Sequence, residues 1–385
     1  MFAQRTNWNL ASNRLSQALA RRRAEGKCVL DLTTSNPTAC GFHFDAPAIL
    51  SALANPAALA YEPDPRGLES ARRAVSNYYA GCGAEVPVAD IFLTTGTSEA
   101  YSFVFRALCD PGDEILVPVP SYPLFDFLAD LHDVKLAPYP LVYDHGWQMD
   151  FHALQQAIAP RTRAVIVVHP NNPTGHYVKP EEAAKLTEIC SARGIAVIAD
   201  EVFLDFSLRE PRPATFATSA GALIFTFSGL SKISGLPQMK AAWLVVGGPR
   251  ELKAQAAARL EVIADTFLSM NAPVQLAVPA FLEMRHSFQR LAMSRIRKNL
   301  AALDARLASQ KSCGRLEVEG GWYAVLSVPA TRPDEDLAIE LVEREGVSVH
   351  PGHFYNFSGD RWLLVSLLTL EHDFAEGIER LLAMF

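Results

Sequence analysis

Short runs of valine, isoleucine and leucine recur through the middle of the chain and alternate with longer stretches at helical spacing. The runs that predict buried strands are 91–93, 115–117, 164–168, 195–199, 222–227 and 243–246. Helical spacing elsewhere predicts helices, including 46–53, 68–79 and a segment from 97 to about 108. Strands that alternate with helices form βαβ units, so the pattern predicts a mainly parallel sheet buried on both faces.

The pattern changes after about residue 275, where a charged, helix-rich stretch leads into further strand-like segments. A chain of 385 residues also exceeds one ordinary domain. We therefore predict an α/β fold with a large domain over 46–275, built on a seven-stranded type of sheet between helices. A smaller α+β domain is predicted over 276–385, with residues 1–45 joining it, so that both chain ends build this domain.

Composition narrows the class of function. The 35 basic and 42 acidic residues include no basic block, which argues against a nucleic-acid partner. No run of about 18 apolar residues occurs and the start lacks an apolar signal core, so we expect a cytoplasmic protein with no membrane partner. The six cysteines are scattered without paired spacing, which indicates reduced thiols, and no metal site is predicted.

Polar, turn-forming residues follow several of the predicted strands. They are Thr95 to Ser98, Tyr122, Asn172, Asp200 and Lys232. Each alone has an ordinary explanation as a turn or cap residue. Ligands of parallel sheets bind beyond the carboxyl ends of the strands, where all of these residues should gather. Together they predict one binding site.

Lys232 lies in a Ser/Gly-rich turn directly after an apolar run, with no acidic residue nearby in the sequence. Burial there would lower the pKa of the amine and free it as a nucleophile. An activated amine of this kind holds a carbonyl cofactor as a Schiff base. On this stretch alone, a solvated loop lysine is the alternative.

The neighbouring candidates suit pyridoxal phosphate held on Lys232. A carboxylate keeps the pyridine nitrogen protonated, which is a role for Asp200. Tyr122 would stack on the ring, and Asn172 would donate to its phenolate oxygen. The phosphate suits backbone N–H groups at a helix start. The residues predicted to provide them are Gly96, Thr97 and Ser98.

At these residues the sequence resembles the class I/II aminotransferases, which are fold type I pyridoxal-phosphate enzymes. The matching motifs follow the family's order over about residues 30–370 and are Tyr61…Gly67, 95–100, 111–114, 120–123, 171–175, 200–202 and Ser231-Lys232. The resemblance implies ping-pong transfer of an amino group from an amino acid or amine donor to a 2-oxo acid acceptor. It also implies that Lys232 binds the cofactor and moves the substrate proton, with Ser231 beside the cofactor. A homodimer with shared active sites is implied, in which Tyr61 reaches the neighbouring subunit's cofactor phosphate.

Three positions depart from the family pattern. Phe203 stands where the family usually has tyrosine, which removes a hydrogen bond to the phenolate oxygen. Lys240 stands where arginine is usual and keeps a charge for the phosphate without the bidentate fork. Leu364 occupies the position of the arginine expected to clamp the substrate's α-carboxylate. Either another cation compensates, or the substrate carries no carboxylate there.

Arg66, Arg361 and His350 are the candidates for that compensation, and Asn36 is a further candidate substrate residue. The alternative is that both arginines are solvated loop residues and that the histidine only packs beside Pro351. An aminotransferase is the first functional hypothesis. The alternatives are a pyridoxal-phosphate lyase acting at Cβ, such as a C–S lyase, and a non-catalytic protein that binds the cofactor.

Overall fold

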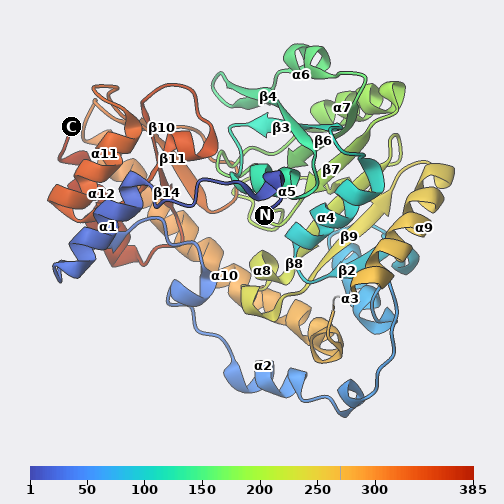
Figure 1. Cartoon of the computed structure of the whole chain (residues 1–385). Coiled ribbons are helices and arrows are strands. Elements are labelled where there is room, and N and C mark those ends of the chain that lie inside the picture. The colour runs from blue at the N-terminus through green and yellow to red at the C-terminus, as the bar shows by residue number, and fades with distance from the viewer. Residues whose placement is uncertain (269) are drawn as a thin grey trace.

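The computed structural model describes residues 1–268 and 270–385 and builds them around one large and two small sheets (Figure 1). The strands of the large sheet are β2 (Ile91–Thr94), β3 (Glu114–Val119), β4 (Lys135–Tyr143), β5 (Trp147–Met149), β6 (Thr162–Val168), β7 (Ala196–Asp200), β8 (Ile224–Gly229) and β9 (Ala242–Gly247). Their order is β2-β9-β8-β7-β6-β3-β4-β5. The strands from β8 to β4 run parallel, whereas β9 is antiparallel to both of its neighbours.

The α/β fold and the mainly parallel sheet are thus confirmed, and all six predicted strands are present. The sheet has eight strands, one more than the seven-stranded type, because the chain turns back after β4 and pairs β5 with it. The β4 segment carries two prolines and mixes apolar with polar residues, so its sequence lacks the apolar run that marks the central strands.

Helices cover both faces of the large sheet. They are α3 (Glu69–Ala80), α4 (Thr97–Leu108), α5 (Leu124–Leu131), α6 (Phe151–Ala157), α7 (Pro180–Arg193) and α9 (Arg250–Phe267). Successive strand side chains point to opposite faces. Accordingly, Ile115 packs with α4, α5 and α9, whereas Leu116 packs with α6 and α7. The helix predicted at 46–53 is α2 (Ala46–Leu53), and α7 begins at Pro180 and ends at Gly194, as its cap signals indicate.

The smaller part of the molecule joins the two ends of the chain. Four strands form a sheet in the order β10-β11-β14-β13, namely β10 (Gly314–Arg315), β11 (Tyr323–Ser327), β14 (Trp362–Ser366) and β13 (His350–Pro351). Beside it, β1 (Leu30–Asp31) pairs in parallel with β12 (Val347–Ser348). Helices α1 (Arg14–Ala24), α11 (Asp334–Glu340) and α12 (Glu371–Leu382) lie together here, the first from one chain end and the others from the opposite end (Figure 1).

The helix α10 (Ala272–Ala308) connects the two parts of the molecule (Figure 1). The predicted boundary between residues 275 and 276 therefore falls inside a helix. The remaining short elements are α8 (Leu230–Ile233), η1 (Gln4–Thr6), η2 (Pro37–Ala39), η3 (Pro56–Leu59), η4 (Val88–Asp90), η5 (Phe216–Thr218), η6 (Pro237–Met239), η7 (Leu341–Glu345) and η8 (Gly352–Tyr355). Among the residues described, no helix is long and apolar enough to cross a membrane.

Candidate active site

A cavity of ≈ 620 Å³ lies at the carboxyl ends of β6, β7 and β8, and residues from both parts of the molecule line it. The cavity lies at this edge of the sheet because the ends of parallel strands leave backbone groups and loop side chains free to bind a ligand. The predicted residues that line it are Thr97, Ser98, Tyr122, Asn172, Asp200, Ser231, Lys232 and Lys240. The structure thus gathers into one cavity eight of the residues that the sequence predicted for the cofactor.

Lys232 lies on the short helix α8, which follows directly from the end of β8. Its ammonium nitrogen lies 5.4 Å from the ring centre of Phe203 and 5.0 Å from that of Trp322. Burial lowers the pKa of Lys232 below its ordinary value, an effect that the nearby charge of Asp200 opposes. The lysine is therefore an amine with a raised uncharged fraction, as a nucleophile requires.

Asp200 ends β7 and is only 9% exposed. The Tyr101 hydroxyl donates to its Oδ2 at 3.0 Å, and the Val202 N–H donates to its Oδ1 at 3.2 Å. Burial raises the pKa of Asp200 to about 6, although both hydrogen bonds and Lys232 favour the charged form. No ion pair holds this carboxylate among the residues that the structure describes, so it is suited to pair with a ligand that carries an N–H⁺ group. Sequence reasoning missed Tyr101, whose only signal is its place one turn along the helix that starts at Thr97.

The start of α4 and Lys240 form the end of the cavity suited to an anion. Thr97 and Ser98 begin this twelve-residue helix, and their side chains line the cavity. The Lys240 ammonium lies 3.5 Å from the place that a Cβ on Gly96 would occupy. The unpaired N–H groups of a helix start and an adjacent ammonium together bind a phosphate. Lys240 thus lies beside the start of α4, and its binding of a phosphate remains a prediction.

The cavity also fits an aromatic ring. Among the residues described, no hydrogen bond involves the side-chain amide of Asn172, whose oxygen is buried, so its NH₂ group is free to donate to a ligand. Tyr122 lies at the opening and packs edge-on against Phe125. Phe203 lines the wall where the family usually has tyrosine, and its ring offers no hydrogen bond. These residues fit pyridoxal phosphate in chemistry as well as in position.

Three polar residues predicted to bind the substrate do not line this cavity. Asn36 is exposed and its side chain caps η2, where Oδ1 accepts from the Thr38 N–H at 3.1 Å, whereas its neighbour Ser35 lines the cavity. Arg66 binds Glu261 through two nitrogens, at 2.8 and 3.1 Å, and lies over the ring of Phe92. Arg361 is exposed and stacks on its neighbour Trp362 at 5.4 Å. Within the described chain, neither arginine faces the cavity.

Leu364 is fully buried in β14 and packs with Tyr355, Val325 and Leu316. It does not line the cavity, so the space beside it is filled by apolar side chains rather than left for another cation. Its register partner on the neighbouring strand β13 is His350, and this histidine does line the cavity.

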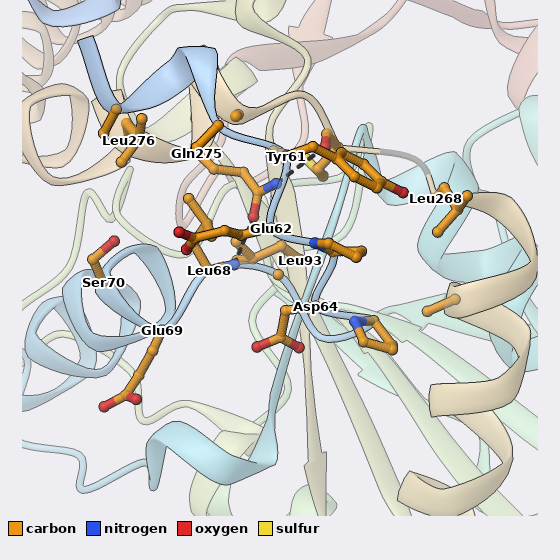
Figure 2. Close-up of a pocket in the computed structure, with 18 of the residues that line it drawn as sticks. Tyr61, Glu62, Asp64, Leu68, Glu69, Ser70, Leu93, Leu268, Gln275 and Leu276 are labelled. Carbon is orange, nitrogen blue, oxygen red and sulfur yellow. Dashed lines mark hydrogen bonds between the residues drawn. The ribbon is translucent and has the colours of Figure 1, made fainter. Parts of the chain in front are cut away.

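Tyr61 lies in a second, separate pocket of ≈ 390 Å³, on the extended chain that precedes α3. Figure 2 shows its phenol projecting toward the side on which Leu268 lies, away from the Gln275 amide. Gln275 fixes the loop by accepting from the Leu68 N–H at 2.6 Å. Tyr61 itself is 77% exposed, so within one chain it is not part of the Lys232 cavity.

Comparison with known proteins gives consistent results. The chain matches the sequence profile of the family "Aminotransferase class I and II" over residues 8–381. It is 30% identical to the alanine aminotransferase of Mycobacterium tuberculosis over 380 residues, 95% of this chain and 87% of the relative. It is 32% identical to the glutamate-pyruvate aminotransferase AlaA of Escherichia coli over 265 residues, 68% of this chain and 65% of the relative. The solved structure of an alanine aminotransferase from Pyrococcus furiosus superposes with a TM-score of 0.89 at 22% identity, covering 99% of this chain and 98% of that one.

Proposed function

The chain belongs to the class I and II aminotransferase family, and from this premise we propose that it exchanges the amino group of L-alanine with a 2-oxo acid, with pyruvate as the keto partner of alanine. Dependence on pyridoxal phosphate and use of amino-acid and oxo-acid substrates follow from membership of the family. The observation that carries the proposal is the convergence of Lys232, Asp200 and Asn172 on one cavity. The choice of alanine rests on relatives named for alanine and for pyruvate.

Bound pyridoxal phosphate would supply an aldehyde that takes up the amino group and a ring that draws electrons from the reacting carbon. In our proposal Asp200 holds the proton at the ring nitrogen and Asn172 binds the ring's oxygen. Lys232 accepts the proton from the α-carbon of the substrate, a role that its lowered pKa supports because more of the amine is uncharged at a given pH. Tyr122 and Phe203 lie where they would limit access of water to the ring.

The proposed reaction predicts a reversible colour change. L-Alanine added to the yellow holoenzyme, without any oxo acid, is expected to remove the visible absorbance of the cofactor, and pyruvate is expected to restore it. The measurement is a visible absorption spectrum after each addition, with D-alanine as the control. Release of ammonia with the absorbance unchanged would instead identify a lyase. Bleaching by simple amines but not by alanine would overturn the proposed donor.

We also propose a homodimer in which Tyr61 completes the phosphate site of the partner subunit. The supporting observation is that Tyr61 is exposed, shares a pocket with the exposed Leu268 and follows the exposed Leu59 by two positions. Exposed apolar surface of this kind is typical of an interface between subunits.

Hybrid dimers test the sharing of sites. Tyr61→Phe removes one hydrogen bond to a charged group and is expected to lower affinity for pyridoxal phosphate about tenfold. Mixing Tyr61→Phe subunits with Lys232→Ala subunits is expected to restore one site of normal affinity per hybrid dimer, because that site takes its lysine from one subunit and its tyrosine from the other. A cofactor titration of the separated hybrid measures this. A hybrid without any normal site would show that Tyr61 acts within its own subunit.

A further inference from the structure

The cavity must accept a carboxylate although the expected arginine is absent. Members of the family act on amino and oxo acids, and this inference rests on the proposal above that the present chain does the same. Leu364 offers no charge and is packed among apolar side chains. A carboxylate without a cationic or hydrogen-bonding partner in such a cavity would be strongly disfavoured.

Few side chains are available to replace the arginine. Among the described residues that line the cavity, only Lys232, Lys240 and His350 can carry a positive charge. Lys232 is the amine that the cofactor needs, and Lys240 lies beside Gly96 at the anion end. His350 alone remains, and it is directly opposite Leu364 across the β13–β14 pair. Directly opposed residues in an antiparallel pair have Cβ atoms about 5 Å apart on the same face.

The imidazole of His350 has one nitrogen fixed and one free. Its Nδ1 lies 2.9 Å from the Tyr355 hydroxyl, which also lines the cavity. In the part of the chain that the structure describes, no hydrogen bond involves Nε2. A histidine oriented through one ring nitrogen presents the other to a ligand.

We propose that His350, protonated as the substrate enters, binds the carboxylate of the amino and oxo acids through Nε2 in place of the guanidinium that Leu364 lacks. In the charged ring both nitrogens donate, so Nδ1–H donates to the Tyr355 oxygen and Nε2–H donates to the carboxylate. The proton comes from solvent, one for each carboxylate bound. His350 is thereby the specificity-determining residue of the cavity.

The groups around His350 favour its protonation when a carboxylate binds. Burial lowers the pKa of His350 below its ordinary value, so the empty cavity holds a neutral ring, while Asp31 on β1 acts in the opposite direction. The Asp31 carboxylate accepts hydrogen bonds from the Thr33 N–H and hydroxyl, and its other oxygen lies 4.0 Å from Arg23. The other titratable groups that line the cavity with His350 are Tyr101, Tyr122, Tyr323, Tyr355, Asp200, Lys232 and Lys240. Asp334 on α11 binds His353 outside the cavity. An incoming carboxylate is therefore the anion that raises the proton affinity of His350.

The proposal predicts a pH dependence confined to substrates that carry a carboxylate. The KM for L-alanine is expected to rise with pH above neutrality, up to about tenfold per unit, because each carboxylate requires one proton. The KM for L-alaninol, which has CH₂OH in place of the carboxylate, is expected to lack this additional rise. The value of kcat for alanine should change much less than KM over the same range.

Two asparagine variants form a matched pair. His350→Asn keeps an N–H donor but never carries a charge. It is therefore expected to raise the KM for L-alanine about 10- to 100-fold at pH 6.5 and to leave the KM for L-alaninol unchanged. His353→Asn is the control, because this histidine lies three residues along, pairs with Asp334 and does not line the cavity. Unchanged alanine binding in His350→Asn, or an equal loss with both substrates, would overturn the proposal.

A binding measurement separates this inference from the proposed reaction. 2-Aminoisobutyrate has a carboxylate but no hydrogen on its α-carbon, so it binds without completing transfer. Calorimetric titration of the holoenzyme with this compound at pH 8, in buffers of different ionisation enthalpy, measures the number of protons taken up on binding. The wild type is expected to take up about one proton more than His350→Asn. Equal uptake would refute the role of His350. If the wild type converted neither alanine nor pyruvate but still took up the additional proton, the proposed substrates would be wrong and the carboxylate site at His350 would be supported.

A second variant keeps the test independent of the folding of His350→Asn. Tyr355→Phe leaves the imidazole in place and removes only the oxygen that orients Nδ1. It is expected to raise the KM for alanine about tenfold, again without effect on alaninol. Equal effects on both substrates would show that Tyr355 and His350 only shape the cavity.

Discussion

Replacement of Lys232 by alanine is expected to lower the rate of transamination by at least about 10³-fold, because the variant loses both the amine that holds the cofactor and the base that moves the proton. Among the described residues that line the cavity, no second amine is placed to take over this role. Lys240, the only other lysine among the described residues lining the cavity, lies beside Gly96 at the anion end. The variant should still bind the cofactor through its phosphate and ring, without a covalent link.

Borohydride treatment followed by peptide mass analysis measures the link directly. In the wild type the cofactor is expected to become fixed to the peptide that contains Lys232, and in Lys232→Ala to no peptide. Lys298→Ala is the matched control, because that side chain is 60% exposed and pairs with Glu371 far from the cavity. Cofactor fixed to Lys240 in the variant would show that Lys240 reaches the aldehyde and does not serve only the phosphate.

Much of the large sheet was predictable because its signals are local. Apolar runs of three to six residues mark the predicted strands, and α2 coincides with the helix predicted at 46–53. The ends of parallel strands necessarily share one edge, so Asp200 and Lys232 could be placed together without any knowledge of their contacts. By contrast, β4 and β5 exist because they pair with each other, and nothing local in 135–149 announces that pairing.

The substrate residues were harder to predict because they depend on contacts between distant segments. Arg66 looked free in the sequence, yet it is bound by Glu261, which lies 195 positions away. Asn36 was the predicted substrate residue, but its amide caps its own turn, whereas the neighbouring Ser35 lines the cavity. The pairing of His350 with Leu364 likewise depends on the register of β13 and β14. A motif aligns residues with a family, whereas such contacts are properties of the fold.

Asp200→Asn is expected to lower the rate about 10²- to 10⁴-fold, because an amide cannot keep the ring nitrogen of the cofactor protonated. The wild-type carboxylate is also expected to give cofactor binding a pH dependence. Since the pKa of Asp200 in the cofactor-free chain is about 6, affinity should fall as pH drops below 6 and the carboxylate is neutralised. Fluorescence titration of the cofactor-free chain measures this, and Asp200→Asn should lack that part of the decline.

The same substitution is expected to stabilise the cofactor-free chain, opposite in sign to its effect on activity. Asp200 has a pKa of about 6 in the folded chain against 3.8 for the free side chain, so its burial in charged form costs at most about 3 kcal/mol at neutral pH. This cost is absent below about pH 4 and complete above about pH 6. The free energy of unfolding in urea should therefore be higher for Asp200→Asn than for the wild type above pH 6, and the two should be equal below pH 4.

Glu201→Gln provides the control for replacing a buried carboxyl group by an amide at this point of the fold. Glu201 is buried next to Asp200 but binds Thr215 and the Phe216 N–H outside the cavity. Burial raises the pKa of Glu201 to about 8, so the side chain is mostly uncharged at pH 7 and the amide changes little in charge. Its variant is expected to keep normal cofactor binding and activity. Equal loss of activity in both variants would mean that any substitution at the end of β7 disturbs the site. Loss confined to Asp200→Asn, together with higher stability of the cofactor-free chain, would mean that the Asp200 carboxylate destabilises the empty fold and that its charge is needed to bind the cofactor.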